Sequence, residues 1–246
     1  VLARPSARLR SHGLLVADYA RAMAAILRGI RIAASDVSAA AAFLASVCGT
    51  SATRSDRGGL LVPVGDAELI VEAPTEQDGK GIQGALIEGG AIDGTSRLNG
   101  LEIEVGAHPP RHASESADVV LDHLAVLVTD LESAAQRWEA VTGATAELIG
   151  LHPISGGTLR AARLALGDRM IELVSPVSGR PSPLSTRLET NGEGPFALAM
   201  PAADLDDKLR RLEEQQIRTV WQDPHWLVHP ANPAGLLIQL TPRVQH

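Results

Sequence analysis

Cysteine and aromatic side chains are scarce in this sequence, which excludes a disulfide framework and a core built from aromatic residues. The chain has a single cysteine, Cys48, in 246 residues, so no framework of disulfides within the chain stabilises the fold. Phe, Trp and Tyr make up 2% of the residues, so the core must be built mainly from aliphatic side chains. Cys48 falls on the apolar face of a predicted helix, and we interpret it as a small core residue. Its isolation favours a reducing, cytoplasmic location.

Positive charge and long apolar runs are also lacking. The formal net charge of -7 gives no general attraction to nucleic-acid phosphates. No segment approaches the ~18 uninterrupted apolar residues that a membrane-spanning helix needs. We therefore expect no nucleic-acid partner and no membrane span, and we interpret residues 1–26 as an N-terminal arm with a short helix.

What the sequence does contain is an internal repeat. A β-prone run ends at Asp36, and a second one ends at Asp130. The interval between these two Asp residues also separates Gly49 from Gly143. Each Asp suits a helix N-cap and each Gly a left-handed C-cap, so a helix is predicted between the two members of each pair. Hairpin signals follow both helices, so the repeated unit is one strand, one helix and three strands.

A third copy begins with a predicted strand at 196–201 and a helix capped by Asp204. The alternating residues 98–105 have no helix after them and are interpreted as the remnant strand of a fourth unit. The fold class is therefore α+β, built from repeated βαβββ modules with helices outside the sheets, and the family resemblance given next implies that these mixed sheets are cupped and partly closed. Residues 27–106 form a degenerate module plus the remnant strand, 107–118 a linker, and 119–246 a pair of modules.

Four segments carry a resemblance to a known family. Residues 121–134 are similar to the opening strand and helix of the vicinal oxygen chelate (glyoxalase and bleomycin-resistance) superfamily, 166–176 to its fourth strand, and 228–240 to its last hairpin. Residues 182–194 resemble the linker of methylmalonyl-CoA epimerases, the group closest in pattern. The resemblance implies paired modules whose inward-facing side chains bind a divalent metal.

Carried over residue by residue, the resemblance places metal ligands at His123 and Glu172 in the first module. In the second module the corresponding positions hold Ala197 and Gln239. The implied metal site therefore consists of His123, Glu172 and Gln239, and the metal would be Zn, Mn, Co, Ni or Fe. In the N-terminal copy the matching positions are Gly29 and Ile70, so no site is expected there.

Other residues are candidates for the same site. Glu172 lies in an apolar strand, where an unpaired carboxylate is costly, so it is expected to face a metal, a cation or a ligand, and to act as the catalytic base. Four residues near the predicted hairpins are candidates for substrate binding: Phe196, Trp221, His225 and Trp226.

Three functions remain open at this stage. The first is a metal-dependent isomerase, epimerase or lyase that stabilises an enolate of a small oxygenated substrate, an acyl-CoA included. The second is a metal-free protein that binds and sequesters a small molecule, as bleomycin-resistance proteins do. The third is a metal-free enzyme with Glu172 as base. The repeat also predicts either a monomer with an internal pseudo-dimer or a homodimer.

Overall fold

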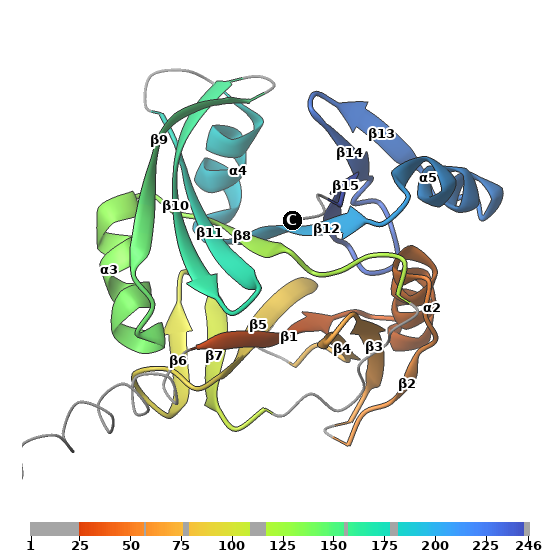
Figure 1. Cartoon of the computed structure of the whole chain (residues 1–246), viewed down its shortest axis with the longest axis horizontal. Coiled ribbons are helices and arrows are strands. Elements are labelled where there is room, and N and C mark those ends of the chain that lie inside the picture. The colour runs from red at the N-terminus through yellow and green to blue at the C-terminus, as the bar shows by residue number, and fades with distance from the viewer. Residues whose placement is uncertain are drawn as a thin grey trace, which may run out of the picture.

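The structure is a computed structural model in which two mixed sheets lie back to back (Figure 1). Its described residues are 25–56, 58–75, 79–108, 117–154, 157–177 and 182–243. The predicted N-terminal arm up to residue 24 and the predicted linker from 109 to 116 lie outside them. The expected α+β class, with repeated modules in mixed sheets, is confirmed, and neither sheet closes into a barrel. No helix among the described residues is long and apolar enough to span a membrane.

Sheet A comes from the N-terminal half of the chain. Its strands, in spatial order, are β2 (Thr53–Arg54), β3 (Leu60–Val64), β4 (Ala67–Glu72), β1 (Ile26–Ala33), β5 (Gly81–Glu88), β7 (Leu101–Gly106) and β6 (Gly94–Leu98). β1 pairs in parallel with β4 and antiparallel with β5. The helix α2 (Val37–Cys48) packs on β3 and β4.

Sheet B comes from the C-terminal half. Its strands, in spatial order, are β13 (Thr219–Gln222), β14 (His225–Val228), β15 (Leu237–Pro242), β12 (Gly194–Ala202), β8 (His123–Leu127), β11 (Arg169–Pro176), β10 (Gly157–Leu166) and β9 (Ala146–Ile154). Its helices are α3 (Leu131–Thr142), α4 (Pro183–Asn191) and α5 (Leu205–Glu214). The first strands of its two modules, β8 and β12, pair antiparallel at the centre.

The predicted caps are present in the repeated helices. Asp36 and Asp130 accept hydrogen bonds from backbone amides at the starts of α2 and α3, and Gly49 and Gly143 end these helices in the left-handed conformation. The helix α4 was not expected, because 182–194 was interpreted as a linker. It begins with a capping box at Ser182, which satisfies free amides of the first turn.

The fourth unit is larger than predicted. Its first strand is β5, which pairs with β1 as β12 pairs with β8, and its last strands are β6 and β7. The single strand expected over 98–105 is divided by a turn, in which Asn99 and Gly100 have φ angles of 46° and 75°. Leu98 precedes Leu101 by three residues, so the apolar alternation changes phase at this turn, and the Asn99-Gly100 pair is a hairpin signal that the interpretation as one strand overlooked.

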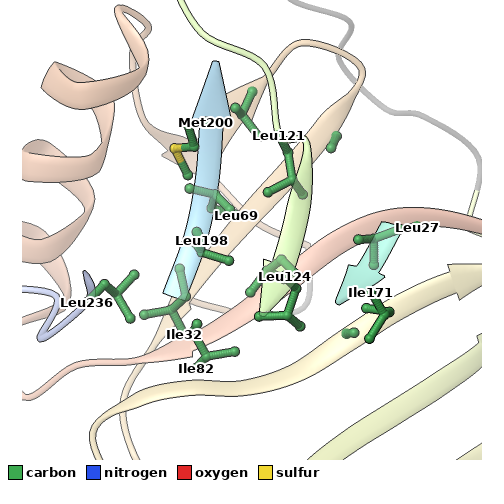
Figure 2. Packing of buried hydrophobic residues seen from close by; sticks show 14 of the residues in the cluster. Leu27, Ile32, Leu69, Ile82, Leu121, Leu124, Ile171, Leu198, Met200 and Leu236 are labelled. Atoms are coloured by element: carbon green, nitrogen blue, oxygen red, sulfur yellow. The ribbon is translucent and has the colours of Figure 1, made fainter. Parts of the chain in front are cut away.

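The two sheets share one hydrophobic core. The face of sheet B that packs on sheet A, α3 and α5 is called its outer face. Figure 2 shows side chains from the two sheets meeting between them, among them Leu27, Ile32, Leu69, Leu124, Ile171 and Leu198. Each fully buried side chain of this type contributes roughly 1.5–3 kcal/mol to stability. Cys48 belongs to the same core, and burial raises the pKa of its thiol to about 12. The thiol therefore stays protonated at neutral pH, which supports its interpretation as a core residue.

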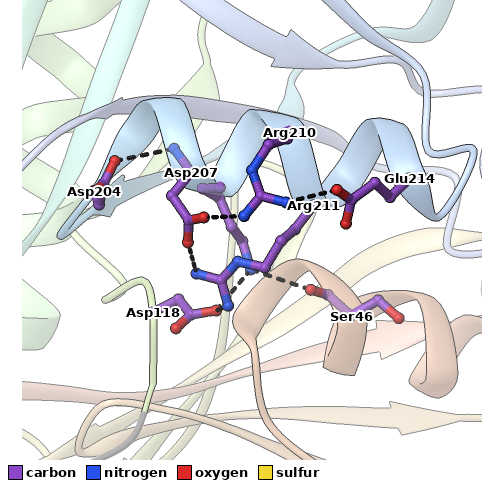
Figure 3. A network of polar contacts seen from close by, with 8 residues as sticks. Ser46, Asp118, Asp204, Asp207, Arg210, Arg211 and Glu214 are labelled. Atoms are coloured by element: carbon purple, nitrogen blue, oxygen red, sulfur yellow. Dashed lines mark hydrogen bonds and ion pairs between the residues drawn. The ribbon is translucent and has the colours of Figure 1, made fainter.

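A buried polar network joins α5 to the N-terminal half (Figure 3). The Lys208 side chain is 2% exposed, and its Nζ lies 3.1 Å from the Ser46 carbonyl oxygen at the end of α2 and 3.3 Å from Asp118 Oδ2. Arg211 also pairs with Asp118, at 2.8 Å. Burial lowers the pKa of Lys208, although the Asp118 carboxylate opposes this effect. These contacts fix the position of the second module relative to α2.

Candidate functional site

The candidate site lies on the face of sheet B opposite to the core, which we call the inner face. Directly paired residues on neighbouring strands project to the same face of a sheet. The register pairs Glu172 with Ala125, two residues along β8 from His123, so both predicted residues belong to this face. Both side chains are mostly buried, at 15% exposure for His123 and 17% for Glu172.

Four side chains form a continuous polar chain across this face. His123 Nε2 lies 3.5 Å from Glu172 Oε2, and His123 Nδ1 lies 2.7 Å from Asp122 Oδ2. On the other side, Arg163 Nε donates a hydrogen bond of 2.9 Å to Glu172 Oε1. The imidazole thus lies between two carboxylates, and Glu172 lies between an imidazole and a guanidinium.

The sequence interpretation missed two of these four polar side chains, Asp122 and Arg163. Asp122 immediately precedes the strand residue His123, and Arg163 follows Ala161 at the two-residue spacing of a strand. Arg163 is directly paired with Glu172 across β10 and β11. The predicted two-residue hairpin, with Leu166 opposite Arg169, already implies that Arg163 lies opposite Glu172, but the sequence interpretation did not extend the pairing that far.

The register also places the two substituted ligand positions. In the antiparallel pair of β8 and β12, His123 lies opposite Ala199 and Ala125 lies opposite Ala197. A two-fold rotation that superposes one strand on the other therefore places Ala197 at the position of His123. The same rotation brings Gln239, paired with Ala199, onto the position of Glu172, paired with Ala125. The second module therefore has a methyl group and an amide where the first has an imidazole and a carboxylate.

This donor set does not fit a divalent metal held by three firm protein ligands. Gln239 lies two strands from His123, across β12, and its neutral amide oxygen would be a weak third ligand. It makes no hydrogen bond to His123 or Glu172 in the part of the chain that the structure describes. One Glu172 oxygen is held by the permanently charged Arg163. Among the described residues, no group of three or more His, Cys, Asp or Glu side chains could hold a metal ion. The predicted metal site is therefore not confirmed.

The predicted substrate-binding residues fall on both faces. Leu227 pairs with Gln239, so His225, two residues earlier on β14, projects to the inner face. Trp226 pairs with Leu240 of the core and with Trp221, so both indoles lie on the outer face, with ring centroids 5.6 Å apart. Substrate binding by the two tryptophans remains a prediction that this placement does not support.

The inner face has an apolar end as well as a polar one. A cluster separate from the main core is formed by Leu127, Leu159, Ala161 and Val174. Partly buried side chains pack against it, including Phe196 and, from α4, Leu184 and Leu188. Phe196 is thus the predicted aromatic residue that reaches this part of the inner face. The helix α4 covers one end of it, between the β9–β11 side and the β13–β14 side of the sheet (Figure 1).

Sheet A has different chemistry at the equivalent positions. The register confirms that Gly29 corresponds to His123 and Ile70 to Glu172. A Cβ atom at Gly29 would lie 3.0 Å from Glu68 Cγ and 3.2 Å from Leu86 Cδ1, so a side chain at this position would require these neighbours to shift. Arg31, on the same face, is ion-paired with Glu72 and Glu102. The expectation that this half has no site remains a prediction.

Comparisons with known proteins agree with this architecture. Residues 121–236 match the glyoxalase-like domain family. The human mitochondrial methylmalonyl-CoA epimerase is 26% identical over 129 residues, which are 49% of this chain and 72% of that protein. The crystal structure of methylmalonyl-CoA epimerase from Mycobacterium tuberculosis is 27% identical, covers 55% of this chain and 95% of its own, and has a TM-score of 0.46.

One similarity extends over both sheets. A mutant of 4-hydroxymandelate synthase from Streptomyces coelicolor is similar over 90% of this chain and 94% of its own, with 15% identity and a TM-score of 0.64, which shows the fold alone. Residues 121–236 in the C-terminal half thus match a glyoxalase-like domain, and this match supports the predicted resemblance to the vicinal oxygen chelate superfamily.

Proposed function

We propose that the chain is a metal-free acid–base enzyme that enolises a small oxygenated carbonyl substrate, with Glu172 as the base and His123 as its proton-transfer partner. The observation that carries this proposal is the 3.5 Å separation between His123 Nε2 and Glu172 Oε2. His123 Nδ1–H donates to Asp122, so the Nε2 atom and Glu172 can share or exchange one proton.

The proposed reaction begins at the carbon next to the substrate carbonyl. The Glu172 carboxylate removes a proton from this carbon, and the C–H electron pair becomes the double bond of an enolate. His123 donates its Nε2 proton to the carbonyl oxygen, which gives an enediol. Glu172 then delivers its proton to the former carbonyl carbon, while His123 Nε2 removes the proton from the hydroxyl on the neighbouring carbon, which becomes the new carbonyl. Because both groups lie on one side of the substrate, this geometry suits an isomerisation between adjacent carbons.

Epimerisation at one carbon fits the geometry less well. A two-base epimerisation needs a proton donor or acceptor on each face of the reacting carbon. The position equivalent to Glu172 holds Gln239, whose amide has no useful basicity. The human relative is an epimerase of methylmalonyl-CoA, so acyl-CoA thioesters remain a substrate class for this chain alongside α-hydroxy aldehydes and ketones.

Solvent-deuterium exchange tests the proposal. The protein is incubated in D2O with a panel of α-hydroxy aldehydes, α-hydroxy ketones and acyl-CoA thioesters that includes methylmalonyl-CoA. Deuterium at the α-carbon is measured by mass spectrometry. We expect exchange with at least one class, and a loss of at least about 100-fold in Glu172→Gln. A matched control is Glu132→Gln, on the exposed surface of α3. Equal exchange in both variants would contradict the assignment.

A second candidate function is sequestration of a small apolar molecule, without chemistry. The separate cluster of Leu127, Leu159, Ala161 and Val174 on the inner face favours it. Native mass spectrometry of the purified protein distinguishes the two functions. A retained apolar ligand, together with no deuterium exchange in any substrate class, would favour the binding function.

A further inference from the structure

Arg163 lies beside the proposed base, and nothing in the proposed proton transfer uses it. Its position on β10 pairs directly with Glu172 on β11 and with Glu147 on β9, so the three side chains share a row of the inner face. The Nε–H of Arg163 is engaged by Glu172 Oε1 at 2.9 Å. The Arg163 side chain is 46% exposed, so a molecule from solvent can reach it.

Most of the guanidinium's hydrogen-bonding capacity remains unused. Nη1 and Nη2 of Arg163 have no hydrogen-bond partner among the residues that the structure describes. A guanidinium presents five N–H donors in a planar fork that matches two neighbouring oxygen atoms. Because Glu172 holds the Nε side, the remaining fork is oriented relative to the carboxylate that removes the substrate proton.

The carboxylates around Arg163 would repel an enolate, and a cation at this position would offset that repulsion. Glu147, Glu172 and Asp122 are carboxylates on or beside the same part of the face. An enolate forming next to Glu172 would be repelled by them. With no fitting metal site, the guanidinium in contact with Glu172 is the positive charge placed to offset this repulsion, and such preorganised charge is a large contribution to catalysis.

We propose that Arg163 is the oxyanion-binding residue of this site, and that its free fork binds two vicinal oxygens of the substrate, one of which carries the negative charge of the enolate. This inference rests on the proposed function and extends it, because it names the ligand chemistry: a small carbonyl compound with a hydroxyl or carboxylate oxygen on the next carbon. The proton moves to Glu172, and the negative charge that develops on the carbonyl oxygen lies beside Arg163 until His123 protonates that oxygen.

Oxalate, a planar anion with two vicinal oxygens, is a suitable probe. Its binding to the full chain is measured by isothermal titration calorimetry in the presence of a chelator. We expect wild-type protein to bind oxalate, Arg163→Gln to bind it about tenfold to 100-fold more weakly, and Arg163→Lys to be intermediate because it retains charge but not the fork. Arg160→Gln is the matched control, since Arg160 lies on the same strand and pairs with Glu132 on the helix side. Circular dichroism checks that each variant is folded.

The outcomes separate this inference from the proposed function. Equal oxalate affinity in wild-type and Arg163→Gln protein, or no oxalate binding by the wild type under chelation, would overturn the role of Arg163. If deuterium exchange still depends on Glu172 in that case, the proposed function stands alone. If oxalate binding depends on Arg163 but no substrate class exchanges deuterium, the anion site stands and the proposed reaction fails.

Discussion

Asp122 Oδ2 lies 2.7 Å from His123 Nδ1, on the side of the imidazole ring that faces away from Glu172. A carboxylate at this position accepts the Nδ1–H and so selects which nitrogen faces the reacting atoms. The Asp122 side chain is 37% exposed and does not contact Glu172. In the proposed mechanism Asp122 is therefore a positioning residue, which acts on the substrate through His123.

Asp122→Asn is expected to lower kcat for deuterium exchange by about tenfold to 100-fold, with little change in KM. The reason is that an amide can donate to Nδ1 and so favour the wrong tautomer of His123. The measurement is steady-state exchange in D2O. Asp168→Asn, in the exposed turn between β10 and β11, is the control. An equal fall in both variants, or a change confined to KM, would show that Asp122 does not orient His123.

The metal content of the protein is expected to be far below one equivalent. His123, the Arg163-bound Glu172 and the neutral amide of Gln239 are a poor set of three ligands for a divalent metal. Elemental analysis of protein purified without chelators or an affinity tag measures this directly, and thermal unfolding with added Mn, Co, Ni or Zn provides a second readout. A stoichiometric metal that is lost in His123→Ala would restore the metal-dependent function expected from the family resemblance.

Removing either partner of the buried Lys208–Asp118 pair has unequal consequences. Asp118→Asn leaves the Lys208 ammonium buried without its carboxylate, and we expect a loss of about 3 kcal/mol in the free energy of unfolding. Lys208→Met leaves Asp118 paired with Arg211, so the change should be within about 1 kcal/mol. Urea unfolding measures both variants. Equal destabilisation would mean that the loss of packing, not the isolated charge, decides the cost.

Glu193 lies near the junction of the two sheets, and its ionisation makes the stability of the fold depend on pH. Burial alone would raise its pKa, but hydrogen bonds from the Thr129 amide and the Asn99 side chain more than offset this, so the pKa lies below its ordinary value of 4.5. The folded state therefore gains stability from the ionised carboxylate above about pH 4.5 and loses it as the pH falls through the lowered pKa.

Urea unfolding of wild-type and Glu193→Gln protein at neutral and acidic pH checks this effect. The wild type should be the more stable at pH 7, and the difference should shrink as the pH falls below about 4.5. Glu189→Gln, on the exposed side of α4, is the control. A difference between wild type and Glu193→Gln that stays constant with pH would show that the ionisation of Glu193 is not coupled to folding.

Local patterns in the sequence were sufficient for much of the fold. The Asp and Gly residues at the helix ends act through hydrogen bonds within a few residues, so α2 and α3 could be predicted from their spacing. The equivalence of Ala197 to His123 followed from the repeat, and the register of β8 and β12 agrees with it. The turn at Asn99 was missed although the Asn99-Gly100 pair is typical of a two-residue hairpin and the apolar alternation changes phase between Leu98 and Leu101.

The chemistry of the site could be predicted only in part. His123 and Glu172 were identified, but the contact that changes their interpretation comes from Arg163, and it depends on the register between two strands. Trp221 and Trp226 were assigned to binding because of their residue type, whereas the pairing of β14 with β15 places them on the outer face. Which face a residue occupies near a sheet edge is set by pairing, and one residue of register reverses it.

Deuterium exchange by chelator-treated protein shows directly whether Glu172 and His123 transfer protons without a metal. The exchange rate of wild-type protein, dialysed against a chelator and assayed in its presence, is compared with that of untreated protein and of Glu172→Gln. We expect an unchanged rate after chelation and a loss of at least about 100-fold in Glu172→Gln. Exchange that disappears on chelation and returns when a divalent metal is added would contradict this expectation.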